Sequence, residues 1–369
     1  MTAVNGHTSN GKTRPEPLER PGHGLAGVPL AVEPLNRKDF TSDQEVRWCP
    51  GCGDYAVLSA FQGFMPELGI RKENTVIISG IGCSSRFPYY VDSFGMHSIH
   101  GRATAIATGV ATAREDLAVF VITGDGDALS IGGNHLIHVL RRNVNVTILL
   151  FNNRIYGLTK GQYSPTSELG KITKSTPLGS LDNPFNPVSL ALGAEATFVA
   201  RTIDSDRKHL TGVLRAAAAH RGASFVEIYQ NCPIFNDDAF AAMTDADSSA
   251  DAIIPLRHGE PIRFGAEQRL GVTRDPVSGA FAVVDVDEVG VEGLVVHDAH
   301  APDPSFAFGL SRLTDAGVLH RAPIGIFRDV DAPSYDDLAR EQVALAAGSG
   351  SDDQALQAMI AGGDTWTVH

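Results

Sequence analysis

Four cysteines, spread unevenly along the chain, are the residues best suited to chemistry. Cys49 and Cys52 form a Cys-x-x-Cys motif, whereas Cys83 and Cys232 are isolated. A thioredoxin-like redox pair or a zinc knuckle would account for the motif but not for the two isolated cysteines. Three segments that supply two, one and one thiolates match the ligand set of a [4Fe-4S] cluster, with inert buried cysteines as the alternative.

Polar residues also follow two consecutive apolar runs. The segment 124-GDGD ends one run, and Asn153 ends the next. A divalent cation can bridge a diphosphate to the protein through one carboxylate, one amide oxygen and one backbone carbonyl, which Asp125, Asn153 and Ile155 could supply. The pairing resembles the diphosphate-binding signature of thiamine diphosphate enzymes, and the alternative is two ordinary strand-to-helix loops.

Apolar runs that alternate with helical stretches must position these residues. We predict strands at 75–80, 118–124, 146–152 and 225–230, and helices at 54–65, 100–114, 134–142 and 207–220. This alternation predicts an α/β fold with a mostly parallel sheet and helices on both faces. The carboxyl edge of such a sheet is where ligands bind, because loop amides and helix N-termini converge there.

Changes in composition divide the chain into three parts. Residues 1–38 are rich in Gly, Pro, Asn and Thr and are expected to form a flexible N-terminal arm. Residues 39–236 carry the alternating pattern and the candidate site. Residues 237–369 begin with an acidic, small-residue segment and are expected to be a C-terminal extension that packs on the main domain or on a partner.

Composition excludes several classes of protein. The 30 Lys and Arg residues against 43 Asp and Glu give a net charge of −13, which argues against a nucleic-acid-binding surface. Hydrophobic residues make up 43%, enough for a folded core. We find neither a long apolar window nor the apolar core of a secretory signal, so we expect no membrane partner and a cytoplasmic protein.

Several linked motifs together carry a family resemblance. They are 48-WCPGCGDYAVLSA, 81-IGCSSRFPYY, 99-IHGRATAIATGV, 124-GDGDALSIGGNH, 152-NNRIYGLTKGQYSPTS and 231-NCPIF. With these motifs the chain resembles the β subunit of the 2-oxoacid:ferredoxin oxidoreductases, most closely the two-subunit type associated with 2-oxoglutarate. The resemblance covers about residues 40–236 and implies a thiamine-diphosphate-binding fold.

The resemblance also implies a set of binding residues. The cluster ligands would be Cys49, Cys52, Cys83 and Cys232, and the magnesium ligands would be Asp125, Asn153 and Ile155. The residues implied to line thiamine diphosphate are Ile81, Gly82, Cys83, Ser84, His100, Gly101, Arg102, Ala103, Gly126, Asp127, Gly157, Leu158 and Thr159. The chain departs from the YGMTGGQ-like loop of many relatives at Leu158 and Lys160.

Arg86 and several histidines are further candidates. Arg86 matches the position where a basic residue of the family approaches the substrate, and a guanidinium suits a carboxylate because its donors form a planar fork. A surface ion pair is the alternative for Arg86. We expect His97 and His100 to donate hydrogen bonds rather than shuttle protons. His135 and His138 share a helix face, but no third metal ligand is evident.

The resemblance implies a complete reaction. The enzyme would decarboxylate 2-oxoglutarate oxidatively to succinyl-CoA, with coenzyme A as co-substrate and electrons passed through the cluster to ferredoxin. Its cofactors would be thiamine diphosphate, Mg²⁺ and a [4Fe-4S] cluster, and it would work only with an α subunit, as an α2β2 assembly.

Other functions remain open from the sequence. Pyruvate or several 2-oxoacids could be the substrate of the same enzyme class. A non-oxidative thiamine diphosphate decarboxylase and a zinc-stabilised, non-catalytic binding module are alternatives of other classes.

Overall fold

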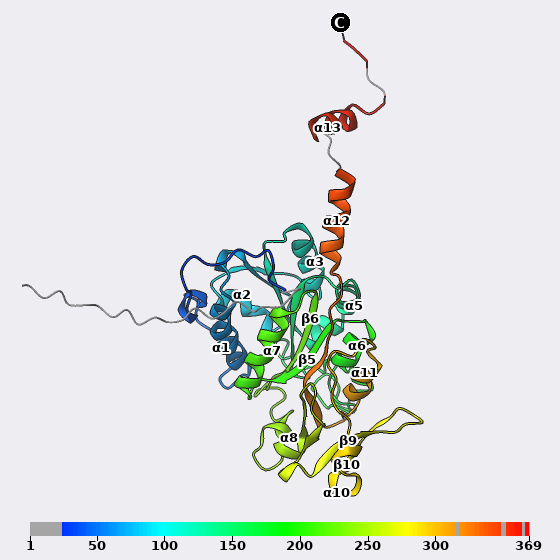
Figure 1. The fold of residues 1–369 in the computed structure, drawn as a ribbon. Coiled ribbons are helices and arrows are strands. Elements are labelled where there is room, and N and C mark those ends of the chain that lie inside the picture. Colours follow the sequence, from blue (N-terminus) through cyan, green and yellow to red (C-terminus); the bar gives the residue numbers. More distant parts are fainter. Residues whose placement is uncertain (1–23, 315–316, 348–351, 364–365, 369) are drawn as a thin grey trace, which may run out of the picture.

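A long mixed sheet forms the centre of the molecule (Figure 1). The computed structural model describes residues 24–314, 317–347, 352–363 and 366–368. In these residues the sheet has eight strands in the order β2-β1-β3-β4-β6-β5-β11-β7. Their bounds are Phe94–His97, Thr75–Ser79, Ala118–Gly124, Val146–Asn152, Ala223–Tyr229, Phe198–Ile203, Ala322–Asp329 and Ile253–Leu256, in that order. The first six run parallel, and β11 pairs antiparallel with β5.

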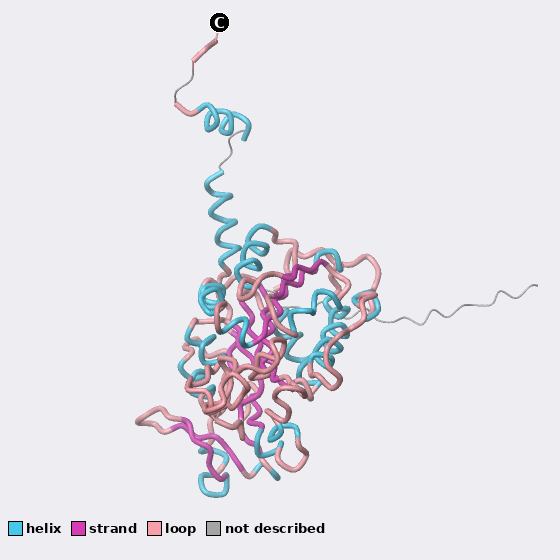
Figure 2. The backbone as a smooth tube through the Cα atoms, turned by 180° about the vertical axis from the view of Figure 1, so that it is seen from behind, coloured by secondary structure: helices cyan, strands magenta, loops and turns pink. Residues whose placement is uncertain are grey.

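Helices cover both faces of the sheet, and Figure 2 shows the strands running between them. One hydrophobic cluster joins the sheet to α1 (Asp54–Phe64), α2 (Phe87–Tyr90) and α7 (Arg207–Ala219). A second joins the opposite face to α3 (Ala103–Ala113), α5 (Gly133–Arg141), α6 (Pro187–Gly193) and α11 (Ser305–Ser311). Double coverage explains why the central strands are continuous apolar runs rather than alternating ones.

The predicted α/β architecture is confirmed. All four predicted strands are present as β1, β3, β4 and β6, and all four predicted helices are present as α1, α3, α5 and α7. The largest difference at a helix start is in α3, which begins at Ala103 rather than at residue 100. The residues before it form a turn in which Gly101 has a φ of +68°. A left-handed residue there ends the turn before the helix begins.

The region after residue 237 contributes to the central sheet, because β7 and β11 come from it. It also forms a small sheet of β8 (Arg263–Phe264), β9 (Leu270–Arg274) and β10 (Phe281–Asp285). Its short helices are α8 (Ala241–Thr244), α9 (Ser249–Ala252) and α10 (Val286–Val289). Helices α12 (Tyr335–Ala347) and α13 (Asp352–Ala361) project from the body in both views (Figures 1 and 2). The domain boundary at residue 237 stays a prediction.

The predicted N-terminal arm falls partly outside the described residues, which begin at residue 24. From there the segment lies against the body: Val28 is buried, and Leu30 forms a β-bridge with Ile70. The described part of the arm is therefore packed rather than free. In the part of the chain that the structure describes, no helix is both long enough and apolar enough to cross a membrane.

One ion pair is buried inside the sheet. Arg201 on β5 donates from Nε to Glu227 Oε2 on β6 at 2.6 Å, and both side chains are at most 1% exposed. The guanidinium also donates to the Pro323 carbonyl on β11 at 3.2 Å, so it ties three neighbouring strands together. Burial opposes the charge on Arg201, but the Glu227 carboxylate and Tyr229 beside it together outweigh this effect and raise the pKa of Arg201.

Glu227→Ala should therefore lower the free energy of unfolding by about 3–5 kcal/mol, because it leaves the Arg201 charge buried without a partner. Denaturant titration followed by circular dichroism measures the loss. Glu67→Ala is the matched control, since it breaks the exposed pair with Arg215 and should cost less than about 1 kcal/mol. Equal losses in the two variants would show that the buried pair does not hold the sheet together.

Candidate functional site

Four neighbouring strands place the candidate residues at one edge of the sheet. Strands β1, β3, β4 and β6 are paired in parallel, so their carboxyl ends meet. The loops after them carry the segment 80–84, Asp125, Asn153 and the segment 230–232. Segments far apart in the sequence are thereby brought together, as expected for a ligand site in an open α/β sheet.

A cleft of about 190 Å³ opens between these loops. Thirteen of the predicted residues line it: Ile81, Gly82, Cys83, Ser84, His100, Asp125, Gly126, Asp127, Asn153, Ile155, Gly157, Leu158 and Thr159. Gly124, Phe151 and Tyr156 also line it and were not predicted. The sequence-predicted magnesium ligands and most of the predicted thiamine diphosphate residues therefore share one cavity.

Asp125 begins α4 (Asp125–Leu129) directly after β3 and is 3% exposed. Its Oδ2 accepts hydrogen bonds from Ser164 Oγ at 2.5 Å and from Thr166 Oγ1 at 2.6 Å. Burial raises the pKa of Asp125 to about 6, and the two hydroxyl donors act in the opposite direction. Because both side-chain donors lie on Oδ2, Oδ1 is the carboxylate oxygen available to a cation in the cleft.

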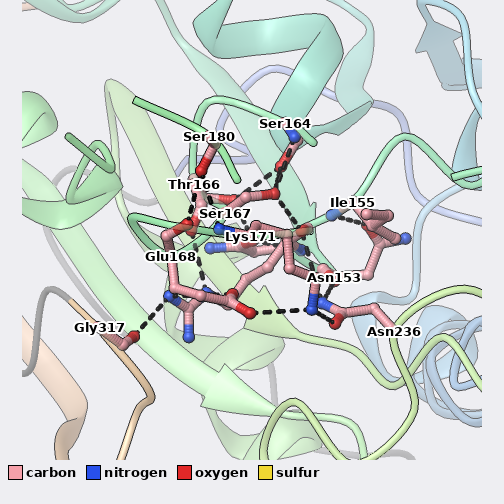
Figure 3. A network of polar contacts seen from close by, with 12 residues as sticks. Asn153, Ile155, Ser164, Thr166, Ser167, Glu168, Lys171, Ser180, Asn236 and Gly317 are labelled. Carbon is pink, nitrogen blue, oxygen red and sulfur yellow. Dashed lines mark hydrogen bonds and ion pairs between the residues drawn. The ribbon is translucent and has the colours of Figure 1, made fainter. Parts of the chain in front are cut away.

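A tight turn after β4 holds the other two predicted magnesium ligands (Figure 3). Arg154, in the left-handed region with a φ of +57°, lies between Asn153 and Ile155. The Ile155 N–H donates to Asn153 Oδ1 at 3.2 Å, and Ser167 Oγ donates to the Arg154 carbonyl at 2.6 Å. The Arg154 side chain donates to the carbonyls of Thr166 and Gly317, at 3.0 and 2.9 Å. Both backbone and side-chain hydrogen bonds therefore hold this turn in place.

Asp127 is predicted to contact the cofactor, but its carboxylate is fully engaged by the protein. Oδ1 accepts from the backbone N–H groups of Ile81 at 3.1 Å and Gly101 at 2.7 Å, and lies 2.8 Å from His100 Nδ1. Oδ2 accepts from Thr123 Oγ1 at 2.7 Å. Asp127 therefore joins the loop after β1 to the turn before α3 and fixes the position of both beside the cleft.

Three residues of the predicted thiamine diphosphate set are not part of the cleft lining. Gly101 faces Asp127, as described above. Arg102 donates to the carbonyls of Gly101 and Ile131, and Ala103 is buried at the start of α3. Their assignment as cofactor contacts stays a prediction.

The four cysteines are free thiols. Cys49 is exposed, Cys52 and Cys83 are half-buried, and Cys232 is buried. A methyl group at Gly157 would lie 3.5 Å from the Cys232 sulfur and 3.7 Å from the Cys83 sulfur, so these two sulfurs face the same glycine. Cys83 belongs to the cleft lining itself.

The surroundings of the sulfurs affect their charge. Burial raises the pKa of Cys83 to about 12, and the nearby Asp54 carboxylate and the other sulfurs add to the shift. Burial likewise raises the pKa values of Cys52 and Cys232. Thiolates here need a strong positive partner, which an iron centre provides.

The donor set fits an iron–sulfur cluster. Four thiols from three segments converge on one region, and each of Cys52 and Cys83 is influenced electrostatically by at least two of the others. Among the described residues, no three His, Cys, Asp or Glu side chains are arranged around a single ion. Gln230 Nε2 donates to Cys52 Sγ at 3.3 Å, the kind of N–H···S contact found around cluster ligands.

Arg86 lies in a second hollow that continues from the cleft. This hollow, about 510 Å³, shares Ile81, Gly82 and Leu158 with the cleft. Its other lining residues are Gln44, Glu45, Arg47, Arg86, Tyr89, Tyr90 and His97. Arg47 forms an ion pair with Glu45 of the same hollow at 3.2 Å. Arg86 therefore remains the candidate for a carboxylate-bearing molecule next to the predicted cofactor site.

The histidines hold structural positions in the part of the chain described. His97 Nδ1 lies 3.0 Å from Ser79 Oγ on the neighbouring strand β1. His135 and His138 lie on α5 and belong to no metal-binding group among these residues. The residues that sequence reasoning left without a role are Ser164, Thr166 and Gln230. The first two stand in the SPTS part of a quoted motif, which was their only signal.

Comparisons with known proteins relate the chain to one family. Residues 80–228 match the family model "Thiamine pyrophosphate enzyme, C-terminal TPP binding domain". The chain is 63% identical to the 2-oxoglutarate oxidoreductase subunit KorB of Mycobacterium tuberculosis, over 93% of this chain and 91% of that protein. It is 46% identical to subunit beta of 2-oxoacid:ferredoxin oxidoreductase 1 from Aeropyrum pernix, over 52% of this chain and 60% of that protein.

A solved structure is similar in fold as well as in sequence. It is the 2-oxoglutarate:ferredoxin oxidoreductase from Magnetococcus marinus with 2-oxoglutarate, coenzyme A and succinyl-CoA bound. The match has a TM-score of 0.71 and 36% identity, and covers 90% of this chain and 99% of that one.

Asp127→Ala should lower the free energy of unfolding by about 3 kcal/mol or more, because hydrogen bonds to a buried carboxylate are each worth about 1.5–3 kcal/mol. It should also weaken thiamine diphosphate binding, since the loop after β1 and the turn before α3 would no longer be joined by hydrogen bonds to the Asp127 carboxylate. Thermal denaturation and calorimetric titration measure the two effects. Asp116→Ala, which removes a half-buried carboxylate that pairs with Arg114 away from the cleft, should lower the free energy of unfolding much less and leave thiamine diphosphate binding unchanged. An unchanged melting temperature in Asp127→Ala would contradict the structural role.

Proposed function

We propose, from the premise that this chain belongs to the family of 2-oxoacid:ferredoxin oxidoreductase β subunits, that it serves a 2-oxoglutarate:ferredoxin oxidoreductase. The observation that carries the proposal is the cleft, which brings the magnesium-type oxygens of Asp125, Asn153 and Ile155 beside Cys83 and its neighbouring sulfurs. A plain decarboxylase has no need of the cysteines, and a zinc module has no need of the oxygens.

In the proposed reaction, oxidised ferredoxin is the oxidant and takes up two electrons for each 2-oxoglutarate. One 2-oxoglutarate, one coenzyme A and two oxidised ferredoxins give succinyl-CoA, CO₂, two reduced ferredoxins and a proton. When bound, thiamine diphosphate supplies the nucleophilic carbon that permits loss of CO₂, and the cluster accepts electrons one at a time.

The residues of the chain have distinct tasks in binding. Asp125, the Asn153 amide oxygen and the Ile155 carbonyl would hold Mg²⁺ against the diphosphate. Ser164 and Thr166 restrain the Asp125 carboxylate through its other oxygen. The four cysteines would hold the cluster through their sulfurs.

The hollow beside the cleft is the proposed substrate entrance. Arg86, Arg47 and Glu45 line it, and it shares Ile81, Gly82 and Leu158 with the cleft. A dicarboxylate such as 2-oxoglutarate offers a second anionic group that a guanidinium in the hollow can bind. This is the feature of the site that favours 2-oxoglutarate over pyruvate.

The proposed partners follow from the relatives. The relatives are named as subunits, which indicates that an α subunit is the partner. We expect an α2β2 assembly with ferredoxin as the electron acceptor. The proposed location is the cytoplasm.

The direct test is an anaerobic assay of the chain co-purified with its α subunit. Viologen dye should be reduced with 2-oxoglutarate, and only when coenzyme A is present. The kcat/KM for 2-oxoglutarate should exceed that for pyruvate at least tenfold. Equal values for both acids would contradict the substrate assignment, and absence of dye reduction with every 2-oxoacid would contradict the reaction class.

Arg86→Gln should raise the KM for 2-oxoglutarate about 10- to 100-fold, since a hydrogen bond between charged groups is worth about 1.5–3 kcal/mol. Steady-state kinetics of the assembled enzyme measure the change. Arg86→Lys should recover part of the loss, because it keeps the charge without the planar fork. Arg114→Gln, on the surface beside Asp116, is the control and should leave KM unchanged. An unaltered KM in Arg86→Gln would exclude the role in substrate binding.

A further inference from the structure

Gln230 lies between the two halves of the proposed site. It follows β6 directly and is 1% exposed. Its side-chain Nε2 donates to Cys52 Sγ at 3.3 Å and to the Asn231 carbonyl. Its Oε1 accepts from Asn153 Nδ2 at 3.1 Å. One buried amide therefore contacts a predicted cluster ligand with one end and a predicted magnesium ligand with the other.

We infer that Gln230 is a positioning residue that couples the cluster to the diphosphate site by holding the Cys52 sulfur and the Asn153 amide at once. The inference rests on the proposed function, because it needs both groups to be bound. Nothing in the motifs of the sequence assigns such a role to Gln230.

Gln230 fixes which way Asn153 points. An amide side chain has a donor end and an acceptor end, and either can be turned toward a ligand. Donation from Nδ2 to Gln230 leaves the acceptor Oδ1 beside the Ile155 N–H. Oδ1 is the atom that a magnesium ion requires, so the glutamine selects the useful orientation.

The packing around Gln230 leaves it little freedom. A Cβ at Gly53 would come within 2.9 Å of Gln230 Cγ, so the loop after Cys52 can approach only because residue 53 is glycine. The backbone N–H of Gln230 donates to the Asn152 carbonyl at 3.0 Å. A side chain held in this way can position its neighbours without moving itself.

Asn236 forms a second link of the same kind. Its backbone N–H donates to the Cys232 carbonyl at 3.0 Å, and its side-chain Nδ2 donates to the Asn153 carbonyl at 2.9 Å (Figure 3). The segment that carries Cys232 is therefore tied to the same turn after β4. Both links converge on Asn153, one on its side chain and one on its backbone.

The N–H···S contact has a predictable electrical effect. A donor aimed at a ligand sulfur stabilises the more negative, reduced cluster, and this raises the reduction potential. Loss of the donor should shift the potential to more negative values. Loss of the acceptor should free the Asn153 amide to rotate and weaken Mg²⁺ binding.

The test uses Gln230→Leu, Gln230→Glu and the control Gln62→Leu in the assembled α-and-β enzyme. Gln62 is a buried glutamine of α1 whose Nε2 donates to the Tyr90 carbonyl at 2.9 Å, so its replacement removes a similar bond elsewhere. The readouts are the cluster potential, by redox titration followed by electron paramagnetic resonance, and the Mg²⁺ concentration that gives half-maximal thiamine diphosphate binding.

We expect Gln230→Leu to shift the reduction equilibrium toward the oxidised cluster by up to tenfold, or about 59 mV for one electron. It should also raise the Mg²⁺ requirement about 10- to 100-fold, the usual effect of losing a residue that orients a metal ligand. Gln230→Glu keeps an acceptor for Asn153 but no donor for Cys52. It should therefore lower the potential while it leaves the Mg²⁺ requirement within about threefold of wild type.

Several results would overturn the inference. They are a potential in Gln230→Leu equal to that of Gln62→Leu, an unchanged Mg²⁺ requirement in Gln230→Leu, or equal weakening of Mg²⁺ binding by Gln230→Glu and Gln230→Leu. A wild-type enzyme with no cluster signal at all would instead overturn the proposed function, so the two failures are distinguishable.

Discussion

The site depends on one geometric constraint, the parallel alignment of β1, β3, β4 and β6. Because these strands end together, loops separated by up to about 150 residues meet at one edge. The GDGD segment, the Asn153 turn and the segments that carry Cys83 and Cys232 each follow one of these strands. The segment with Cys49 and Cys52 precedes α1 and is joined to this edge by other contacts, such as the one from the Gly53 N–H to the Asn231 carbonyl at 3.1 Å. The same constraint places the proposed electron acceptor beside the proposed cofactor, as a stepwise oxidation requires.

Buried polar groups support this edge from within the sheet. Glu227, paired with Arg201, accepts from Asn152 Nδ2 at 2.7 Å. Thr166 Oγ1 lies within hydrogen-bond distance of both Asn152 Oδ1, at 2.9 Å, and Asp125 Oδ2, at 2.6 Å, and its one proton can be donated to either. A chain of hydrogen bonds thus runs from the core of the sheet to the proposed magnesium ligand. A buried polar group that loses its hydrogen-bond partner costs free energy of folding, so this network restrains the Asp125 carboxylate at its end.

The sequence predicts the parts of the molecule whose signals are local. Apolar runs predict β1, β3, β4 and β6, and the family resemblance that the motifs carry predicts most of the cleft lining. Strands β5 and β11 escape prediction because Arg201 interrupts one apolar run, while Pro323 and Gly325 interrupt the other. Gln230 also escapes, since its partners Cys52 and Asn153 are distant in the sequence and only the folded sheet reveals the contact.

The central claim is that one edge of the sheet holds both a diphosphate site and an electron-accepting cluster. Iron, acid-labile sulfide and zinc content, measured on the chain purified without oxygen together with its α subunit, tests this most directly. The account predicts about four irons and four sulfides per β chain and little zinc. About one zinc per chain and no sulfide would contradict it, because the cysteines would then form a structural site with no part in electron transfer.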